Sequence, residues 1–226
     1  MKRVVIPEWL DSDAGTPSEI AASLLDLNSI NRKFGGIATT QFLVEQVARE
    51  READSLSLLE VAAGSGAVPT AVSAALASRG IQIEVTLLDR AASHLNGNKR
   101  AVAGDALALP FSDHSFDVVS CNLFVHHLAP DEVVRFVNEG LRVCRAAVVI
   151  NDVVRHPAHL GLVYAGMPLY RGRLTRHDAP ASVRRAYTEK EMSEMLRKSK
   201  ASRGEITRHF LFRMGIIAWK TLPATE

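Results

Sequence analysis

Short apolar runs alternate with helical segments through the middle of this chain, and this alternation limits the folds that it can adopt. Apolar runs stand at 57–62, 81–89, 100–104, 116–124 and 146–152. Residues 67–80 and 131–144, which lie between such runs, carry apolar side chains at helical spacing. Alternating strands and helices build βαβ units, in which helices cover both faces of a parallel sheet. The middle of the chain is therefore predicted to be an α/β domain.

The end of the chain departs from this alternation. The stretches 205–210 and 212–220 are rich in β-forming residues and nearly adjacent in sequence. They are too close for a helical crossover, so these two strands must pair antiparallel. Before them, residues 188–199 predict a helix, and Thr188 with Glu191 forms a capping-box pattern at its start. We expect a mainly parallel sheet that ends in an antiparallel hairpin.

The first 55 residues predict a helical segment. A helical pattern runs from Pro17 to about Leu27, and the stretch 31–40 with its pair of glycines interrupts it. A second helix is expected from about Thr40 to Glu52. No internal repeat and no long linker divides the 226 residues, so a single domain is expected.

Charge and cysteine content disfavour several classes of protein. A formal net charge of +2 does not by itself indicate a nucleic-acid or membrane partner. Cys121 and Cys144 both lie in apolar runs, where a thiol behaves as a small core residue, so neither a disulfide framework nor a metal site is expected. No run reaches the length of a membrane helix, and the first residues lack a secretory pattern. We expect a cytoplasmic protein.

The stretch SLLEVAAGSGAVPT (57–70) is the first candidate binding element. A strand that runs into Gly64-Ser65-Gly66 and then a helix turns sharply and leaves bare main chain beside a ligand. Glu60 lies inside the apolar run, where a charge is costly unless a polar group meets it. Ala62 replaces the first glycine of a dinucleotide fingerprint, which disfavours a dinucleotide-dependent oxidoreductase.

Two acids after the following strands point to a nucleoside. Asp89 ends the run 81–89 and could accept hydrogen bonds from both hydroxyls of a ribose; a simple strand-end cap is the alternative. Asp105 follows a short strand and could accept a hydrogen bond from an exocyclic amine of a base. Apolar residues that flank it, Ala106 among them, offer a flat bed for the ring.

In combination, these motifs resemble the class I S-adenosylmethionine-dependent methyltransferases, in particular the branch that acts on small molecules. EVAAGSG (60–66) is similar to the acid-x-G-x-G-x-G motif of that family. GDALALPFSDHSFDVV (104–119) and NLFVHHL (122–128) are similar to its later motifs. The resemblance implies a Rossmann-like, doubly wound α/β fold, whose mainly parallel seven-stranded sheet ends in an antiparallel C-terminal hairpin.

The resemblance also implies a division of labour within one methyltransferase domain over 1–226. An N-terminal helical cap would cover 1–55, the cofactor-binding core 56–152 and a substrate lid 153–187. A helix and the terminal hairpin would occupy 188–226.

S-adenosyl-L-methionine is the cofactor that the resemblance implies. Glu60 would orient the glycine turn or receive the ammonium group of the cofactor, while the methyl group of Ala62 would narrow its approach. Asp89 would hold the ribose and Asp105 the adenine amine. The full set of implied cofactor-binding residues is Arg32, Glu60, Ala62, Ala63, Gly64, Gly66, Asp89, Asp105, Ala106 and Asn122.

A methyl group on a sulfonium is already a strong electrophile, so the enzyme must mainly align a nucleophile and exclude water. A general base helps if the nucleophile is a phenol or an enol. His126 and His127 after the fourth strand and Asp152 at the end of the fifth are the catalytic candidates. One histidine of the pair packing structurally against the sheet is the alternative.

The insert 156–187 mixes aromatic residues with arginines, which favours a small-molecule substrate with an apolar body and a phenolate or carboxylate. Parts of the chain are similar to bacterial methyltransferases of polyketide-type secondary metabolism. No nucleic acid, membrane or metal is expected as a partner. An RNA or protein methyltransferase, or a non-catalytic S-adenosylmethionine-binding member of the fold, stays open as an alternative.

Overall fold

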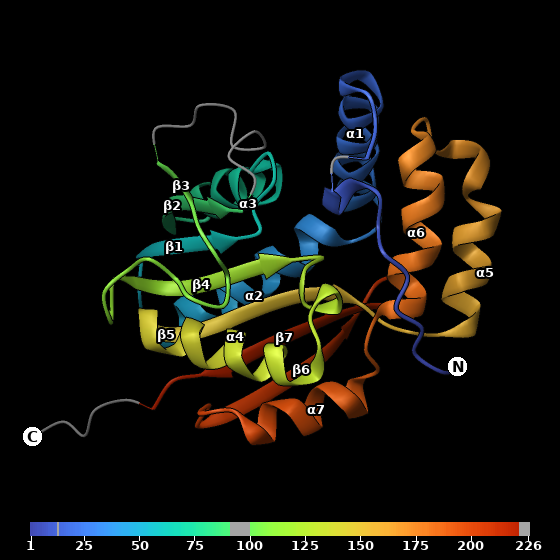
Figure 1. Ribbon diagram of the computed structural model, residues 1–226. Helices are drawn as coiled ribbons and strands as arrows, with labels where there is room; N and C mark the ends of the chain where they lie inside the picture. Colours follow the sequence, from blue (N-terminus) through green and yellow to red (C-terminus); the bar gives the residue numbers. More distant parts are fainter. Residues whose placement is uncertain (13, 91–99, 222–226) are drawn as a thin grey trace, which may run out of the picture.

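The computed structural model describes residues 1–12, 14–90 and 100–221, and within these residues seven strands form one sheet (Figure 1). The strands are β1 (Ser55–Val61), β2 (Gln82–Asp89), β3 (Ala101–Ala103), β4 (Phe116–Asn122), β5 (Cys144–Val153), β6 (Arg203–His209) and β7 (Arg213–Trp219). Their order in the sheet is β3-β2-β1-β4-β5-β7-β6. The neighbours from β3 to β5 pair parallel, whereas β7 pairs antiparallel with both β5 and β6. The predicted fold class is confirmed.

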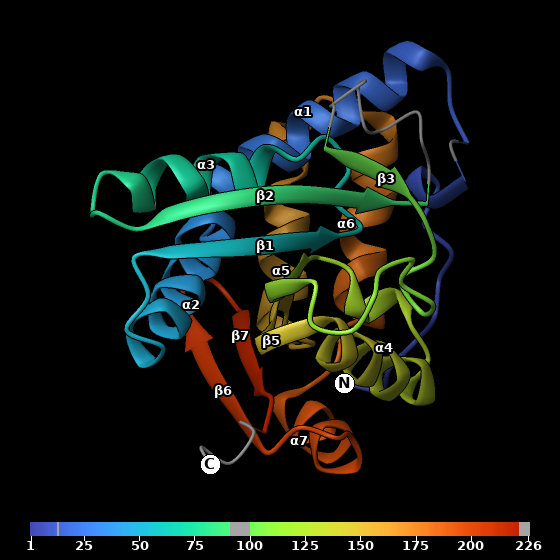
Figure 2. The ribbon, with the colours of Figure 1, turned by 90° about the vertical axis from the view of Figure 1, so that its left-hand side faces the viewer.

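Helices cover both faces of this sheet (Figure 2). The α-helices are α1 (Pro17–Lys33), α2 (Gly36–Glu50), α3 (Ala67–Ala77), α4 (Pro130–Val143), α5 (Pro157–Ala165), α6 (Arg173–Arg185) and α7 (Glu189–Lys198). Helices α2 and α3 pack on one face through a buried cluster that includes Leu43 and Val72. Helices α4 and α7 pack on the other through Phe136 and Met192. These two clusters are the hydrophobic core and hold the strand ends in fixed positions.

The path of the chain opens a crevice beside β1. The chain leaves β1 through α3 for β2 and β3 on one side, and then returns to β4 on the other side. The connection after β1 therefore runs towards one edge of the sheet, and the connection after β4 runs towards the other. In open α/β sheets, ligands bind outside the carboxyl ends of the strands at such a switch point.

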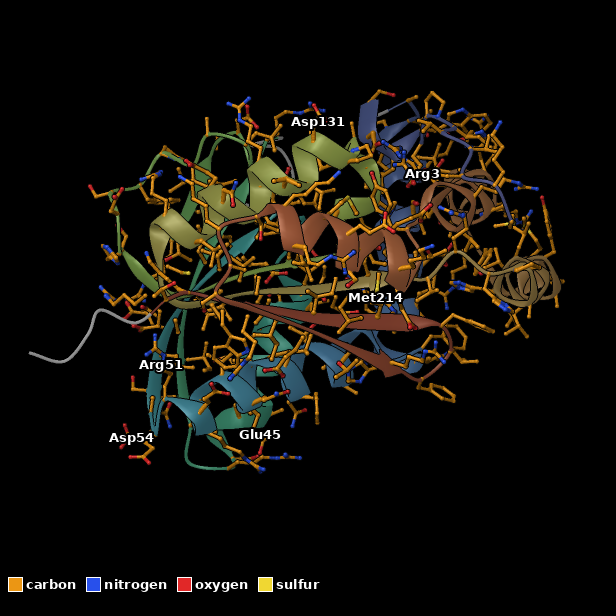
Figure 3. The ribbon with its side chains drawn as sticks, turned by 90° about the horizontal axis from the view of Figure 1, so that it is seen from below. Arg3, Glu45, Arg51, Asp54, Asp131 and Met214 are labelled. Atoms are coloured by element: carbon orange, nitrogen blue, oxygen red, sulfur yellow. The ribbon has the colours of Figure 1, made fainter. Side chains whose placement is uncertain are left out.

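Helices α1, α5 and α6 lie beyond the carboxyl ends of the central strands (Figure 1). The N-terminal segment runs along α6, where Asp178 accepts hydrogen bonds from the amides of Trp9 and Leu10 at 2.8 and 3.0 Å. Figure 3 shows Arg3 at this end of the molecule, and Arg51 and Asp54 at the opposite end, where β1 begins. The first residues and α6 together form one wall of the crevice.

The boundary between the first two helices differs from the prediction. The prediction that α1 ends near Leu27 and that α2 begins near Thr40 was wrong, because the two helices are separated only by 34–35. Gly35 makes the turn with a φ of +79°. A Cβ atom on Gly36 would lie 2.7 Å from the Cα atom of Asn31, so this close approach requires glycine as well. The glycine pair therefore makes a tight corner instead of a longer loop.

The capping box at the start of α7 is confirmed, since Thr188 accepts from the Glu191 amide and Glu191 accepts from that of Thr188. In the described part of the chain, no helix is both long and apolar enough to cross a bilayer.

Candidate active site

A cavity of about 640 Å³ opens at the carboxyl ends of β1, β2 and β4. Most of the residues predicted to bind the cofactor or to act in catalysis lie in its wall. These are Glu60, Ala62, Ala63, Gly64, Asp89, Asp105, Ala106, Asn122, His126 and His127. The structure thus brings together residues from five separate segments of the sequence.

Three predicted residues do not line this cavity. Arg32 lies exposed on α1, and its neighbour Asn31 faces the cavity instead. Gly66 is buried at the start of α3 with a φ of +70°, and a Cβ atom there would lie 2.6 Å from the Leu87 side chain. Asp152 is buried behind His126.

The turn after β1 has an unusual backbone. Ala62 has a φ of +54° and Gly64 a φ of +52°, values in the left-handed region that favours glycine. The amide of Gly64 donates to Oδ2 of Asp89 at 2.8 Å. Apart from Gly64 itself and its two chain neighbours, no described residue has an atom within 4 Å of the place of a Cβ atom on Gly64. The turn is held from β2 and presents bare main chain to the cavity.

Asp105 lies on the exposed rim of the cavity, where its Oδ1 atom accepts from the amide of Leu107 at 2.9 Å. Ala106 and Leu107, which follow it, are part of the cavity wall. The carboxylates of Asp89 and Asp105 therefore lie at the end of the cavity away from the two histidines, where the strands β2 and β3 end.

Glu60 is the buried acid of the cavity, with 2% of its surface exposed. Its Oε1 atom accepts from the side-chain amide of Asn122 at 2.6 Å, while Oε2 has no hydrogen-bond partner among the described residues. Burial raises the pKa of Glu60 to about 7, although the side chains of Asn122 and Ser120 oppose that rise. An unpaired buried oxygen of this kind fits a cationic group, and the ammonium of S-adenosylmethionine is such a group.

A chain of polar side chains supports Glu60 from behind. Asn122 Oδ1 accepts from the hydroxyl of Thr40 at 2.6 Å, and that hydroxyl accepts from the side chain of Asn151 at 2.9 Å. Thr40 comes from α2, and the sequence predictions missed its part in the site. It lies in a helical pattern, and no local signal distinguishes it from an ordinary buried threonine.

The two predicted histidines lie at the other end of the cavity, in the short 3₁₀ helix Val125–His127. His126 is 2% exposed, and its Nδ1 atom lies 2.6 Å from Oδ1 of Asp152. The Nδ1 atom of His127 lies 2.9 Å from Oδ2 of Asp11. Each imidazole is thus fixed by a carboxylate on its Nδ1 side.

Glu8 faces both histidines from the N-terminal segment. Its Oε1 atom lies 3.5 Å from Nε2 of His126 and 3.9 Å from Nε2 of His127, and it accepts from the Ser182 hydroxyl at 2.8 Å. The sequence predictions missed Glu8 and Asp11. Both belong to an acidic, turn-rich stretch, but its composition alone does not reveal what it contacts.

The environment of His126 fixes its charge. Burial lowers its pKa, but the carboxylates of Asp152 and Glu8 outweigh burial and raise the pKa of His126 to about 9. His126 is therefore protonated at neutral pH in the absence of ligands. The cationic ring also holds the pKa of Asp152 low in spite of burial. Asp152 touches the cavity only through His126, so it positions this ring.

A second, mostly apolar cavity of about 450 Å³ adjoins the first, and Leu27, Leu123 and Ser182 line both. Its wall comes from α1, α5 and α6, and therefore includes the predicted lid segment. Arg213 lies in this wall, and burial lowers its pKa to about 10. Among the described residues, no carboxylate oxygen forms an ion pair with its guanidinium.

Comparison with protein families gives one match. Residues 59–150 match the family model described as "Methyltransferase domain". These residues contain the glycine turn, Asp89, Asp105 and both histidines. A search of the curated proteins found no match.

Solved structures share the fold at low sequence identity. A SAM-dependent methyltransferase from Aquifex aeolicus is 17% identical with a TM-score of 0.54, over 74% of this chain and 82% of that chain. The plantazolicin methyltransferase BpumL, in complex with a monoazolic desmethylPZN analog and SAH, is 13% identical with a TM-score of 0.66, over 94% and 92%. The CMeT domain of the citrinin polyketide synthase is 14% identical with a TM-score of 0.61, over 83% of this chain and 52% of that chain.

Proposed function

We propose that this chain, a class I S-adenosylmethionine-dependent methyltransferase, moves the methyl group of its cofactor to an oxygen nucleophile on a small molecule with an apolar body. One observation carries this proposal. A single cavity has bare main chain and an unpaired buried carboxylate at one end and a pair of oriented histidines at the other.

The cofactor end follows from the charge of each wall residue. S-adenosylmethionine, when bound, supplies a methyl group on a cationic sulfonium. Glu60 would receive its ammonium, since the Oε2 atom of Glu60 is buried without a partner. Asp89 would accept hydrogen bonds from the ribose and Asp105 from the adenine amine, at the end of the cavity where β2 and β3 end. Asn122 would hold Glu60 in place for this contact.

The substrate end follows from the second cavity. Its apolar wall suits an apolar body. The guanidinium of Arg213 donates to the Phe34 carbonyl and to the side chains of Asn151 and Asn31, so it would favour a carboxylate or phenolate on that body through its positive charge. The plantazolicin and citrinin-synthase enzymes share this fold and are consistent with a natural-product substrate. The passage lined by Leu27, Leu123 and Ser182 would connect the apolar body to the cofactor.

His126, His127 and Asp152 would prepare the nucleophile. Both rings line the first cavity, which a substrate hydroxyl from the apolar cavity would enter past Leu27, Leu123 and Ser182. Asp152 would act as a positioning residue, because it is buried behind His126. Glu8, which the sequence analysis did not include, joins this group.

The test is a transfer assay with S-adenosylmethionine that carries a tritiated methyl group. The acceptors are a panel of phenols and polyketide-type enols, total RNA and bulk protein. Label in one or more small molecules supports the proposal. Label only in RNA or protein would replace it with that class of substrate, and cofactor binding without transfer to any acceptor would favour a non-catalytic binding protein.

Cofactor binding is tested separately with Asp89→Ala. Loss of the contacts of this carboxylate should weaken S-adenosylmethionine binding by about 2–3 kcal/mol. Asp113→Ala is the matched control, since Asp113 is an exposed acid whose ion pair with Arg142 lies outside the cavity. Equal affinities of the two variants would remove Asp89 from the cofactor site.

A further inference from the structure

Three side chains at the substrate end of the cavity converge on one point. Glu8, His126 and His127 each offer a ligand atom, and these three atoms lie within 4.8 Å of one another. Oε1 of Glu8 is 3.5 Å from Nε2 of His126 and 3.9 Å from Nε2 of His127. Ligands of a tetrahedral zinc ion, at bond lengths of about 2.0–2.2 Å, lie roughly 3.3–3.6 Å apart. The two distances from Glu8 are thus close to that spacing.

His126 provides an independent sign that a ligand belongs here. Its side chain is 2% exposed, and Nε2 has no hydrogen-bond partner among the described residues. Glu8 lies at ion-pair distance but makes no hydrogen bond to this nitrogen. Buried polar atoms of side chains are normally hydrogen-bonded, and the 3.5 Å contact between Nε2 and Oε1 of Glu8 is long for a hydrogen bond, so an ion bound by both atoms would suit this spacing.

Both histidine rings have a carboxylate on their Nδ1 side, as metal-binding histidines usually do. Nδ1 of His126 contacts Asp152 at 2.6 Å, and Nδ1 of His127 contacts Asp11 at 2.9 Å. Histidines that bind a metal usually donate their other ring N–H to a carboxylate or carbonyl, which fixes the tautomer and the orientation of the ring. Here two adjacent histidines both have such a carboxylate, and both direct Nε2 towards Glu8.

We propose that Glu8, His126 and His127 bind a divalent transition-metal ion, with zinc as the best match. Two imidazoles and one carboxylate form a ligand set used by catalytic zinc, in which the fourth position stays open. The open position would face the cavity, because all three residues lie in its wall. No metal was expected from the sequence, because its two cysteines lie in apolar runs and do not cluster with histidines.

Acidic side chains contact the ring nitrogens directly. Glu8 and Asp152 face His126, and Glu8 and Asp11 face His127. The nearby arginines contact the acids and the backbone instead: Nη1 of Arg185 lies 4.0 Å from Glu8 and 3.5 Å from Asp11, and Arg3 donates to the His126 carbonyl at 3.1 Å. The point between Nε2 of the two rings and Oε1 of Glu8 is therefore lined by metal-ligating atoms, which bind a divalent ion when the rings are neutral.

This inference deepens the proposed function and rests on it for its chemical role. The ion would meet a substrate hydroxyl, either a phenol or an enol, that enters from the apolar cavity. Its charge would lower the pKa of that hydroxyl, so that the O–H bond breaks, the electron pair stays on oxygen and the proton passes to water. The site would thus select oxygen nucleophiles for methyl transfer.

The experiment measures zinc bound by the full chain, independently of activity. Chelator-treated protein is dialysed against zinc ions, and its metal content and zinc affinity are measured for wild type, His127→Gln, Asp11→Ala and His114→Gln. We expect one zinc per chain in wild type, loss of that site in His127→Gln and 10–100-fold weaker binding in Asp11→Ala. His114→Gln, which removes an exposed histidine outside the cavity, should bind zinc as the wild type does.

Two results would overturn the inference. The first is wild-type protein without stoichiometric zinc, and the second is equal zinc binding by wild type and His127→Gln. Circular dichroism of each variant excludes unfolding as the cause of a loss. S-adenosylmethionine binding is measured on the same samples. If the protein binds the cofactor and transfers methyl groups but binds no zinc, the metal site is wrong and the proposed function stands. If it binds zinc but not the cofactor, the proposed function is wrong and the metal site stands.

Discussion

The carboxylate of Asp152 contacts both the imidazole ring and the backbone amide of His126. Oδ1 lies 2.6 Å from Nδ1 of the ring, and Oδ2 accepts from the His126 amide at 3.0 Å. Both side chains are buried. One carboxylate at the end of β5 therefore fixes the segment after β4, and with it the substrate end of the cavity.

Asp152→Asn should destabilise the fold by about 3–5 kcal/mol, because it leaves a buried imidazolium without its main counter-charge. Urea unfolding of the metal-free protein at neutral pH measures this loss. Asp113→Asn, which breaks the exposed pair with Arg142, should change the unfolding free energy far less. Equal effects of the two substitutions would contradict the structural role of the buried pair.

The affinity for S-adenosylmethionine should depend on the protonation of Glu60. Burial raises the pKa of Glu60 to about 7 in the ligand-free protein, and only the carboxylate attracts an ammonium. Affinity should therefore rise between about pH 5.5 and 7.5, close to tenfold per unit below the pKa. Equilibrium dialysis measures this profile. Glu60→Gln should bind more weakly and show no such slope, and a flat wild-type profile would place Glu60 outside the contact.

Glu60→Gln, which should weaken cofactor binding, should stabilise the ligand-free protein at high pH. A carboxyl whose pKa is raised on folding holds its proton more tightly in the native state, so the unfolding free energy falls as pH rises from its ordinary pKa of 4.5 through about 7. At pH 8, the burial of charged Glu60 should cost up to about 3 kcal/mol. Glu60→Gln should therefore be more stable than wild type at pH 8 and nearly equal to it at pH 4.5, as measured by urea unfolding. If Glu60→Gln were less stable than wild type at pH 8, the burial of a charged Glu60 would not destabilise the fold.

The sheet could be predicted because its signals are local. Most of the strands are short apolar runs, and the glycine turn and the final hairpin are contiguous in sequence. That Glu60, Asp89 and Asp105 line one cavity could be predicted for the same reason, since each lies in or just after the last residues of such a run.

The rest of the site depends on tertiary contacts. Successive residues of a helix point about 100° apart. The continuation of α1 to Lys33 therefore leaves Arg32 exposed and turns Asn31 towards the cavity. Glu8 reaches His126 because the N-terminal segment is anchored on α6, where Asp178 and the Arg184 carbonyl accept hydrogen bonds from its amides. No spacing in the sequence connects segments so far apart along the chain.

Ala62→Gly should leave the protein equally stable or more stable, unlike most replacements of alanine by glycine. Ala62 has a φ of +54°, a left-handed conformation that costs about 1–2 kcal/mol for a residue with a Cβ atom. Relief of that strain offsets the greater chain entropy of glycine. Ala74→Gly, at an exposed position inside α3, should lose about 1 kcal/mol. Thermal unfolding of both variants measures the contrast, and equal losses would contradict the strain at Ala62.

Leu162→Asp should separate substrate binding from cofactor binding. Leu162 lies on α5, lines the apolar cavity and is 49% exposed, so a carboxylate there should be tolerated by the fold while it repels an apolar or anionic acceptor. We expect KM for an accepted phenol or enol to rise about tenfold, because the bound substrate would lose an apolar contact and meet a charge, with unchanged affinity for S-adenosylmethionine. Val5→Asp is the matched control, because Val5 is 61% exposed and lines neither cavity. Kinetics with the best acceptor from the transfer assay give KM, and dialysis gives the cofactor affinity. An unchanged KM in Leu162→Asp would mean that the substrate does not enter between α1, α5 and α6.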